Sequence, residues 1–214
     1  MNENDIRRKI VSTAQAMSTL GLSPGKSGNV STRFEDGIII TPSGVSYDAM
    51  GTDDLVFVKM NGEVTAPRLK PSSETALHLA VYKAHEDAHA IVHCHSPAAT
   101  ALACAREPIP AFHYMVAVAG GKTIPLAKYA TFGTDELAAS TVTALETANA
   151  CLMANHGQIA LGKTLDKALY LAGEVETLSG EYIDVLKLGR PHVLDDEEMD
   201  RVLERFKTYG QQKT

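Results

Sequence analysis

The residues with the clearest potential for chemistry are two histidines, His93 and His95, which follow the short apolar run 90–92. In a strand alternate side chains point to the same face, so these imidazoles lie ~6.5 Å apart along the chain on one side. Two rings at that spacing can bind one ion with Zn–N bonds of roughly 2.0–2.1 Å. Ser96 and Pro97 have the types of a helix N-cap and a first-turn proline, which predict that the strand ends there. Open α/β sheets tend to bind ligands at such strand ends, but a His-x-His pair alone needs a third ligand.

The third candidate ligand is His156, which ends a second apolar stretch that begins at Cys151 and is followed by Gly157. We predict that His156 meets the first pair across a sheet. Three imidazoles leave an open position on Zn²⁺, which is typical of catalytic rather than structural sites. A carboxylate at Glu74 could fill this position at rest or act as a base, although at a helix start it could instead only complement the helix dipole.

Three loops of small residues are candidates for binding an anion. They contain the pairs Gly28 and Asn29, Ser43 and Gly44, and Ser72 and Ser73. Small residues leave backbone N–H groups accessible, Lys26 would add a positive charge, and a helix capped by Ser72 or Ser73 presents its positive end. The alternative for the first loop is an ordinary helix-to-strand turn. A metal, a base and a phosphate site together are less expected by chance than each alone.

Hydrophobic periodicity and turn residues predict the elements that position these groups. We expect helices over 4–20, after Glu74, over 97–105, over 135–147, a long one capped by Thr164 and a last one over about 196–207. We expect strands over 30–34 and 37–41 as a hairpin, 55–60, 90–95, 124–126 at an edge, and 151–157. Leu186 should face inward, Cys94 should fill the core, and His78, His85 and His89 should be structural or on the surface.

Composition limits the class of protein. The 214 residues fit a single domain over 1–214, and the net charge of -6 argues against a protein that binds duplex nucleic acid. Three cysteines without metal-type spacing suit a reducing compartment. The first residues lack the apolar core of a signal peptide, and no segment approaches the ~18 apolar residues of a membrane span. We therefore expect a cytoplasmic chain with no nucleic-acid or membrane partner.

Several of these motifs together resemble the class II (zinc-dependent) sugar-phosphate aldolase family, which also contains ribulose-5-phosphate 4-epimerases and adducin head domains. The resemblance extends over the whole chain and is carried by Gly28–Ser31, Thr41–Gly44, Pro71–Glu74, His93–His95, Tyr129–Thr134 and Asn155–Gly157. Within the family the sequence is most similar to the enzymes that act on L-fuculose 1-phosphate, because His113–Met115 and Phe206–Gly210 also fit.

The resemblance implies a fold and roles for residues. The fold is a three-layer α/β/α arrangement over a central, mostly antiparallel sheet. Zn²⁺ would be bound by His93, His95 and His156, with Glu74 as a displaceable fourth ligand that becomes the acid/base. Tyr114 of a neighbouring subunit in a ring tetramer would be the second acid/base, and Phe132 and Tyr209 would shape the aldehyde end. The residues that would bind the phosphate are Gly28, Asn29, Ser43, Gly44, Ser72 and Ser73.

The implied reaction is cleavage of C3–C4 in a ketose 1-phosphate such as L-fuculose 1-phosphate, which yields dihydroxyacetone phosphate and L-lactaldehyde. Tyr114 would take the C4 hydroxyl proton and Glu74 would protonate the carbanion carbon, with a metal as electron sink in place of a Schiff-base lysine. Aldolases for 5-deoxyribulose or 5-methylthioribulose 1-phosphate would use the same groups. The resemblance also leaves open a 4-epimerase, a dehydratase and a non-catalytic adducin-like module. Lys26 departs from the small polar residue expected in the fuculose enzymes.

Overall fold

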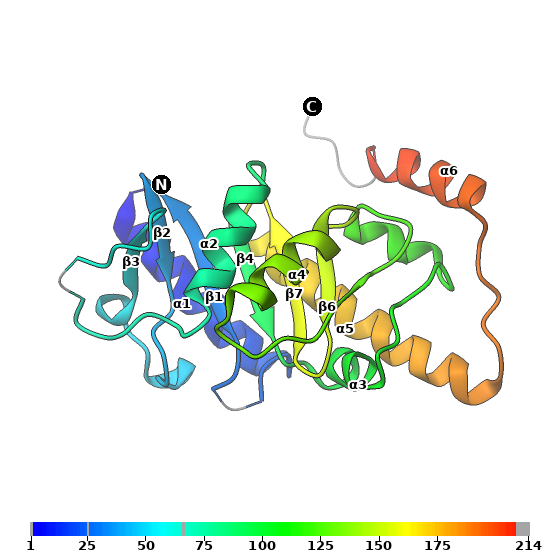
Figure 1. Ribbon diagram of the computed structural model, residues 1–214, viewed down its shortest axis with the longest axis horizontal. Helices are drawn as coiled ribbons and strands as arrows, with labels where there is room; N and C mark the ends of the chain where they lie inside the picture. The colour runs from blue at the N-terminus through cyan, green and yellow to red at the C-terminus, as the bar shows by residue number, and fades with distance from the viewer. Residues whose placement is uncertain (1, 25, 66, 209–214) are drawn as a thin grey trace.

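A seven-stranded sheet with the strand order β3-β2-β1-β4-β7-β6-β5 forms the centre of the protein (Figure 1). The structure is a computed structural model and describes residues 2–24, 26–65 and 67–208. In sheet order the strands are Val56–Lys59, Gly37–Ile40, Asn29–Phe34, Ala90–Cys94, Gly157–Gly162, Ala150–Met153 and Leu126–Ala127. Five of the six pairings are antiparallel, and β5 pairs with β6 in parallel. The expectation of a mostly antiparallel sheet is therefore confirmed.

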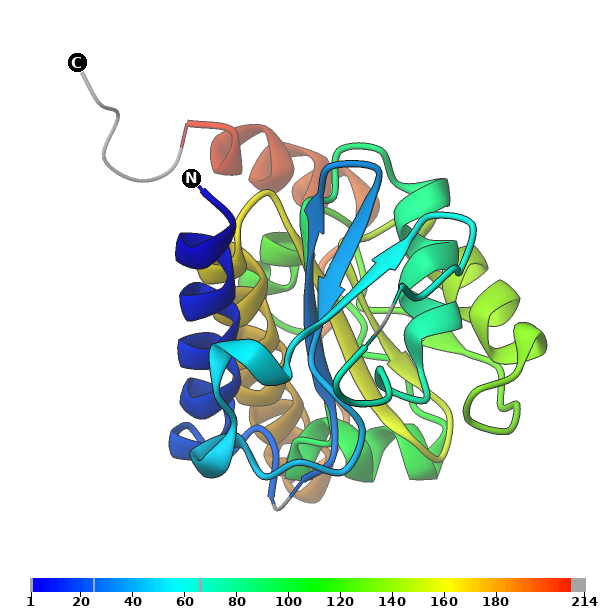
Figure 2. The same ribbon diagram turned by 90° about the vertical axis from the view of Figure 1, so that its left-hand side faces the viewer.

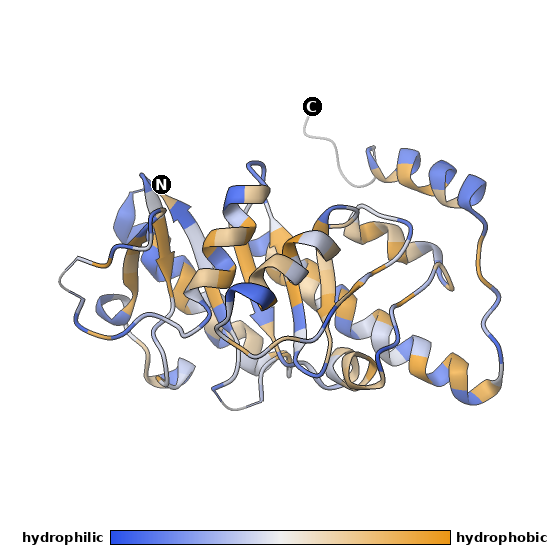
Figure 3. Cartoon of the chain, in the orientation of Figure 1, coloured by the Kyte–Doolittle hydropathy of each residue, from blue (hydrophilic) through white to orange (hydrophobic). Residues whose placement is uncertain are grey.

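Helices cover both faces of this sheet, as Figure 2 shows. The helices α1 (Glu3–Thr19), α3 (Pro97–Ala105) and α5 (Leu165–Leu188) contribute to one apolar core, together with α6 (Asp196–Phe206). On the other face, α2 (Thr75–Ala84) and α4 (Asp135–Leu145) form the second core. The central strands are strongly apolar because both of their faces are covered (Figure 3). The predicted three-layer α/β/α fold is confirmed.

Most predicted elements are present, but the strand β7 was not predicted. The predicted helix over 4–20 is α1, the hairpin is β1 and β2, and the helix over 97–105 is α3. The predicted strand over 151–157 instead ends at Met153, and the chain turns through Ala154–His156 into β7. The sequence predicted no element between His156 and the helix capped by Thr164. This was wrong, because the short apolar run after Gly157 was not recognised as a strand.

Two further local predictions were wrong. Neither Ser72 nor Ser73 is the N-cap of α2: the N-cap residue is Glu74, and its side chain makes no capping hydrogen bond. Leu186 is 41% exposed rather than inward-facing, because the buried face of α5 ends at Tyr182 and the helix continues past the core. Cys94 is fully buried as expected, and all three cysteines are free thiols. In the described part of the chain no helix has the length and apolar character that a membrane crossing requires.

Candidate metal centre and anion pocket

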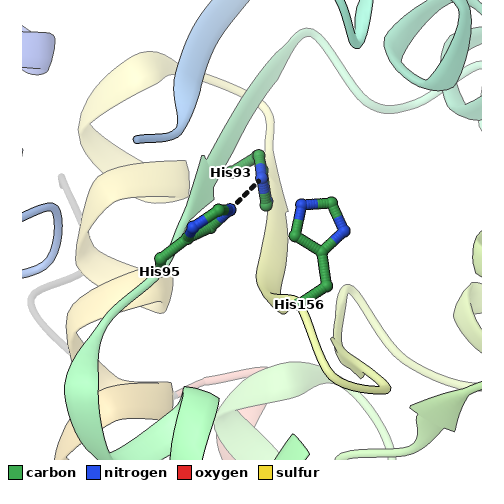
Figure 4. A group of neighbouring side chains, drawn as sticks. All are labelled: His93, His95 and His156. Carbon is green, nitrogen blue, oxygen red and sulfur yellow. Dashed lines mark hydrogen bonds between the residues drawn. The ribbon is translucent and has the colours of Figure 1, made fainter. Parts of the chain in front are cut away.

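Three histidines from two parts of the chain form a tight cluster at one end of the sheet (Figure 4). His93 lies in β4, His95 follows it, and His156 lies in the turn between β6 and β7. Their ring centroids are 4.8 to 5.0 Å apart, and the Nε2 atoms of His93 and His95 are separated by 3.1 Å. One candidate ligand atom from each ring lies within 4.8 Å of the others, so the group could bind a single metal ion.

The sheet orients these rings. β4 and β7 are antiparallel neighbours, and the Nδ1 atom of His93 lies 2.8 Å from the main-chain oxygen of Gln158. Since a carbonyl only accepts, Nδ1–H donates, and Nε2 of His93 is the ring nitrogen that faces the cluster. Gly157 makes room for the second ring, because a Cβ there would lie 2.5 Å from the Cys94 carbonyl oxygen and 2.9 Å from the His95 ring.

Glu74 places its carboxylate against the histidine cluster. This residue is 5% exposed; Oε2 lies 2.9 Å from Nε2 of His93, and Oε1 lies 3.2 Å from Nε2 of His156. Within the described residues Oε1 makes no hydrogen bond, although it is buried. A buried carboxylate oxygen without a hydrogen-bond donor is costly. A cation between this oxygen and the imidazole nitrogens would satisfy it, so the donor set fits a divalent metal.

The protonation states of these groups also suit a metal. Burial acts to raise the pKa of Glu74, but the facing His93 outweighs burial and holds that pKa well below its usual range. Burial, reinforced by the neighbouring His93, lowers the pKa of His95 and of His156 to about 4. Both rings are therefore neutral at neutral pH. Burial acts to lower the pKa of His93, but the facing carboxylate of Glu74 outweighs burial and raises that pKa. A divalent ion would therefore replace the proton of His93, since metals bind neutral imidazoles and ionised carboxylates.

A pocket of about 310 Å³ opens beside the cluster. The predicted site residues that line it are Gly28, Asn29, Ser43, Gly44, Ser72, Ser73, Glu74, His95, Phe132 and His156. Lys26, which was predicted to add a positive charge to the first anion loop, also lines the pocket. Sequence reasoning did not assign five other lining residues, which are Ser27, Pro42, Tyr129, Ala130 and Asn155. Three of them could have been identified by their position, since Tyr129, Ala130 and Asn155 lie inside motifs that carry the family resemblance. A larger hollow of about 1010 Å³, lined by His85, Lys163 and Phe206 among others, contains none of the predicted site residues.

The loops that line the pocket differ from the expected pattern of free backbone N–H groups. The N–H groups of Ser43 and Ser72 donate to the main-chain oxygens of Lys70 and Thr41, which ties the two loops together. An anion here would therefore meet the hydroxyl groups of these serines rather than their N–H groups. Lys26 supplies the positive charge: its Nζ lies 3.4 Å from the Gly44 carbonyl oxygen, beside the same loop.

The remaining predicted residues lie at the edge of the pocket or away from it. Phe132 is 66% exposed in the lining, whereas Tyr114 is 51% exposed and does not line the pocket. Tyr114 begins the 3-10 helix η3 (Tyr114–Ala119), which packs on α5 and α6, and its ring stacks on that of His113. Tyr209 lies outside the described residues.

Comparisons with known proteins agree with this geometry. Residues 8–183 match the family described as "Class II Aldolase and Adducin N-terminal domain". The chain is 48% identical over 205 residues to the 5-methylthioribulose-1-phosphate/5-deoxyribulose-1-phosphate aldolase of Rhodospirillum rubrum, covering 96% of this chain and 92% of the relative. It is 46% identical over 211 residues to the L-fuculose phosphate aldolase of Escherichia coli K12, covering 98% of each. A solved L-fuculose 1-phosphate aldolase structure superposes with a TM-score of 0.93 at 39% identity, covering 97% of this chain and 98% of that one.

Proposed function

The chain belongs to the class II aldolase and adducin N-terminal domain family, and from its similarity to aldolases of that family we propose that it reversibly cleaves a ketose 1-phosphate. The proposed substrate is a compound such as L-fuculose 1-phosphate, and the products are dihydroxyacetone phosphate and L-lactaldehyde. The observation that carries the proposal is a cluster of three imidazoles, two of which contact a buried carboxylate, beside a pocket lined by serines and a lysine. The relatives are named as aldolases, so the enzyme is an aldehyde-lyase.

The proposed metal is Zn²⁺, with His93, His95 and His156 as ligands and Glu74 as the displaceable fourth ligand. This ion would supply Lewis-acid polarisation of the substrate oxygen atoms next to the breaking bond. The phosphate would bind at Gly28, Asn29, Ser43, Gly44, Ser72 and Ser73. These residues line one continuous pocket with Glu74, which supports placing the phosphate within reach of the metal.

Two proton transfers complete the cleavage. A base takes the proton of the C4 hydroxyl while the C3–C4 bond breaks, so that C4 leaves as the aldehyde and the bonding electron pair stays with C3. In the cleavage direction Glu74 takes up a proton from water and delivers it to C3, which gives dihydroxyacetone phosphate, while the first base releases the C4 hydroxyl proton to water. In the reverse reaction the carboxylate removes the C3 proton, and Glu74 is suited to this role because it is ionised, buried and in contact with the cluster.

We assign the first base to Tyr114 of a neighbouring subunit in a homotetramer. The exposure of Tyr114, and its position away from the pocket of its own subunit, support a contribution to another active site. Residues 1–214 would form a single domain of this family in each subunit. A cytoplasmic location is in keeping with three free cysteines.

A second substrate class is supported by the Rhodospirillum rubrum relative, whose name refers to 5-methylthioribulose and 5-deoxyribulose 1-phosphates. These ketoses share the first three carbons with L-fuculose 1-phosphate and differ only in the part that leaves as the aldehyde. The metal and phosphate groups would therefore be the same, and the difference would fall on the exposed side of the pocket near Phe132. Tyr209 remains proposed for the aldehyde from the family resemblance alone.

The test is incubation of the purified enzyme with dihydroxyacetone phosphate and a panel of aldehydes, with and without a metal chelator. We expect ketose 1-phosphate to form, and we expect the chelator to stop it. The ranking of L-lactaldehyde against methylthioacetaldehyde and acetaldehyde then identifies the substrate class. No product with any aldehyde in the metal-loaded enzyme, or full activity after metal removal, would contradict the proposal.

A further inference from the structure

A chain of buried polar side chains runs from α2 and β1 to Glu74. Its successive contacts are Tyr82 Oη to Ser31 Oγ at 3.0 Å, Ser31 Oγ to His78 Nδ1 at 2.7 Å, and His78 Nε2 to Asn29 Oδ1 at 2.5 Å. Asn29 Nδ2 then donates to Glu74 Oε2 at 3.0 Å. Each of these residues except Glu74 is at most 3% exposed, so water does not provide substitutes for the hydrogen bonds.

The spacing of these residues along β1 and α2 explains why their side chains form a continuous series of hydrogen bonds. Asn29 and Ser31 lie two apart in β1 and therefore share a face of the sheet, and Asn29 pairs directly with His93 in β4. On α2, Glu74, His78 and Tyr82 lie four apart and therefore form one row along the helix. Two positions in a strand and one turn of a helix both span ~6 Å, so the strand residues fit between successive helix residues.

The direction of every hydrogen bond follows from the carboxylate. Ionised Glu74 only accepts, so the Asn29 amide must face it with Nδ2, and Asn29 Oδ1 must face His78. His78 therefore donates through Nε2–H and keeps a lone pair on Nδ1, which accepts the hydroxyl proton of Ser31. Burial lowers the pKa of His78 to about 3, so this ring is neutral, as one donor and one acceptor require.

We propose that His78 is a positioning residue for the acid/base: its Nε2–H holds the Asn29 amide in the one orientation that donates to Glu74. This inference rests on the proposed function, in which Glu74 moves the proton at C3. The opposite tautomer of His78 would allow the amide of Asn29 to turn its oxygen toward Glu74, where two negative dipoles would repel. On the far side of the ring, Ser31 Oγ lies 2.7 Å from Nδ1 and 3.0 Å from Tyr82 Oη, so Ser31 can donate to Nδ1 while it accepts from Tyr82, which is the arrangement that the Nε2–H tautomer requires.

The same amide links the acid/base to the anion pocket. The second N–H of Asn29 donates to Ser72 Oγ at 3.0 Å, and the Glu74 N–H donates to that same oxygen at 3.3 Å. With its oxygen accepting twice, the hydroxyl proton of Ser72 remains to donate to a ligand in the pocket. The orientation that His78 imposes on Asn29 thus determines that both Glu74 and Ser72 accept a hydrogen bond from the Asn29 amide.

The first test is the tautomer of His78, measured by ¹⁵N NMR of the histidine rings in the zinc-loaded wild-type enzyme. The signal is assigned by its loss in variants that lack His78. We expect protonated Nε2 and unprotonated Nδ1. A protonated Nδ1, or a charged ring, would overturn the proposal, and this readout does not depend on catalysis.

The second test compares His78→Gln with His78→Asn, two neutral amides of which only glutamine is long enough to place an N–H near the Nε2 position. The measurement is the exchange of the C3 proton of dihydroxyacetone phosphate in deuterated water. We expect His78→Asn to lower the exchange rate about 10- to 100-fold and His78→Gln to retain it within about 3-fold, as for other partners that orient a metal site. Metal content should be that of wild type in both, and KM should change less than kcat.

The outcomes separate this inference from the proposed function. Equal exchange rates in the two variants, whether both high or both low, would overturn the positioning role while wild-type exchange upholds the aldolase. A wild-type enzyme with the expected tautomer but no exchange would overturn the proposed function instead. If His78→Asn does not fold, the wild-type tautomer and the exchange rate of His78→Gln decide: a protonated Nδ1 in the wild type, or a loss of exchange of more than about 10-fold in His78→Gln, would overturn the proposal.

Discussion

The two ends of the pocket are built in different ways: we call the side with Glu74 and the three histidines the metal end, and the side with Lys26 and Phe132 the loop end. At the metal end Asn29, Glu74 and His93 are 3%, 5% and 0% exposed, and they lie in β1, at the start of α2 and in β4. At the loop end the side chains of Lys26 and Phe132 are exposed and lie in loops. The first end is held by several hydrogen bonds to each group, whereas the second is held mainly by loop-to-loop contacts.

This difference indicates where the reaction and the substrate are determined. A buried group with several partners tolerates little change, because removal of one partner leaves the others unsatisfied. An exposed loop residue can change with little effect on folding. We infer that the metal end determines the aldol chemistry and that the loop end selects the ketose, which explains how similar chains can carry the names of different substrates.

The largest effect is expected from His95→Ala at the metal end. The change removes one of the three proposed imidazole ligands, so metal content and cleavage should be lost together, with a rate reduction of at least about 10³-fold. The measurements are metal content by mass spectrometry and the cleavage rate. His89→Ala, an exposed histidine just before β4, is the control and should retain both. Activity in a metal-free His95→Ala enzyme would show that the buried end does not work through a metal.

Glu74→Gln tests the same end without removing a histidine. The amide has the shape of the carboxylate but cannot take up a proton, so metal should remain while C3 proton exchange in dihydroxyacetone phosphate falls about 10²- to 10⁴-fold. Glu176→Gln is a matched control, because that carboxylate accepts from the N–H groups of Ala98 and Ala99 away from the pocket. Normal exchange in Glu74→Gln would mean that another residue is the base.

The sequence predicted the metal end better than the elements around it. His93, His95 and Glu74 lie at the boundaries of strongly patterned elements, so residue type and position together were informative. The placement of His156 was predicted correctly as part of one cluster in space, but for an incomplete reason, because the prediction omitted β7 and ended the strand at the wrong residue. Asn155 has a positive φ, which allows a tight turn between β6 and β7. Two short buried strands joined by so short a turn look like one apolar stretch in the sequence, so hydrophobic periodicity does not separate them.

Longer-range pairings could not be predicted from the sequence. The capping of α3 by Glu176, and the contact of His78 with Asn29, join residues 49 or more positions apart. The sequence identified His78 only as structural or on the surface, since a lone histidine on a helix has no local feature that names its partner. Lys26 was noticed as a departure from the family pattern, but its approach to the Gly44 loop depends on how two loops meet.

Lys26→Thr tests the loop end at its charged side. Loss of the cation should raise KM for the ketose 1-phosphate about 3- to 10-fold with little change in kcat, since exposed charges contribute modestly. Added salt should raise the wild-type KM more than the variant KM, because screening acts on the charge that the variant lacks. Lys163→Thr, an exposed lysine at the larger hollow, should leave both unchanged. A fall in kcat alone would place Lys26 with the reacting groups instead.

Phe132→Ala should produce the smallest effect and act on selectivity alone. The ring is two-thirds exposed, so its removal withdraws only part of an apolar contact with the aldehyde. We expect the ratio of kcat/KM for methylthioacetaldehyde and L-lactaldehyde to change about 2- to 5-fold, less than a fully buried contact would give. Proton exchange in dihydroxyacetone phosphate needs no aldehyde and should keep its wild-type rate in Phe132→Ala. The control is Leu188→Ala, which removes an exposed apolar side chain outside the pocket lining and should leave the selectivity ratio and the exchange rate unchanged. An altered exchange rate in Phe132→Ala would show that the two ends are not independent, because a loop residue would then influence the buried acid/base.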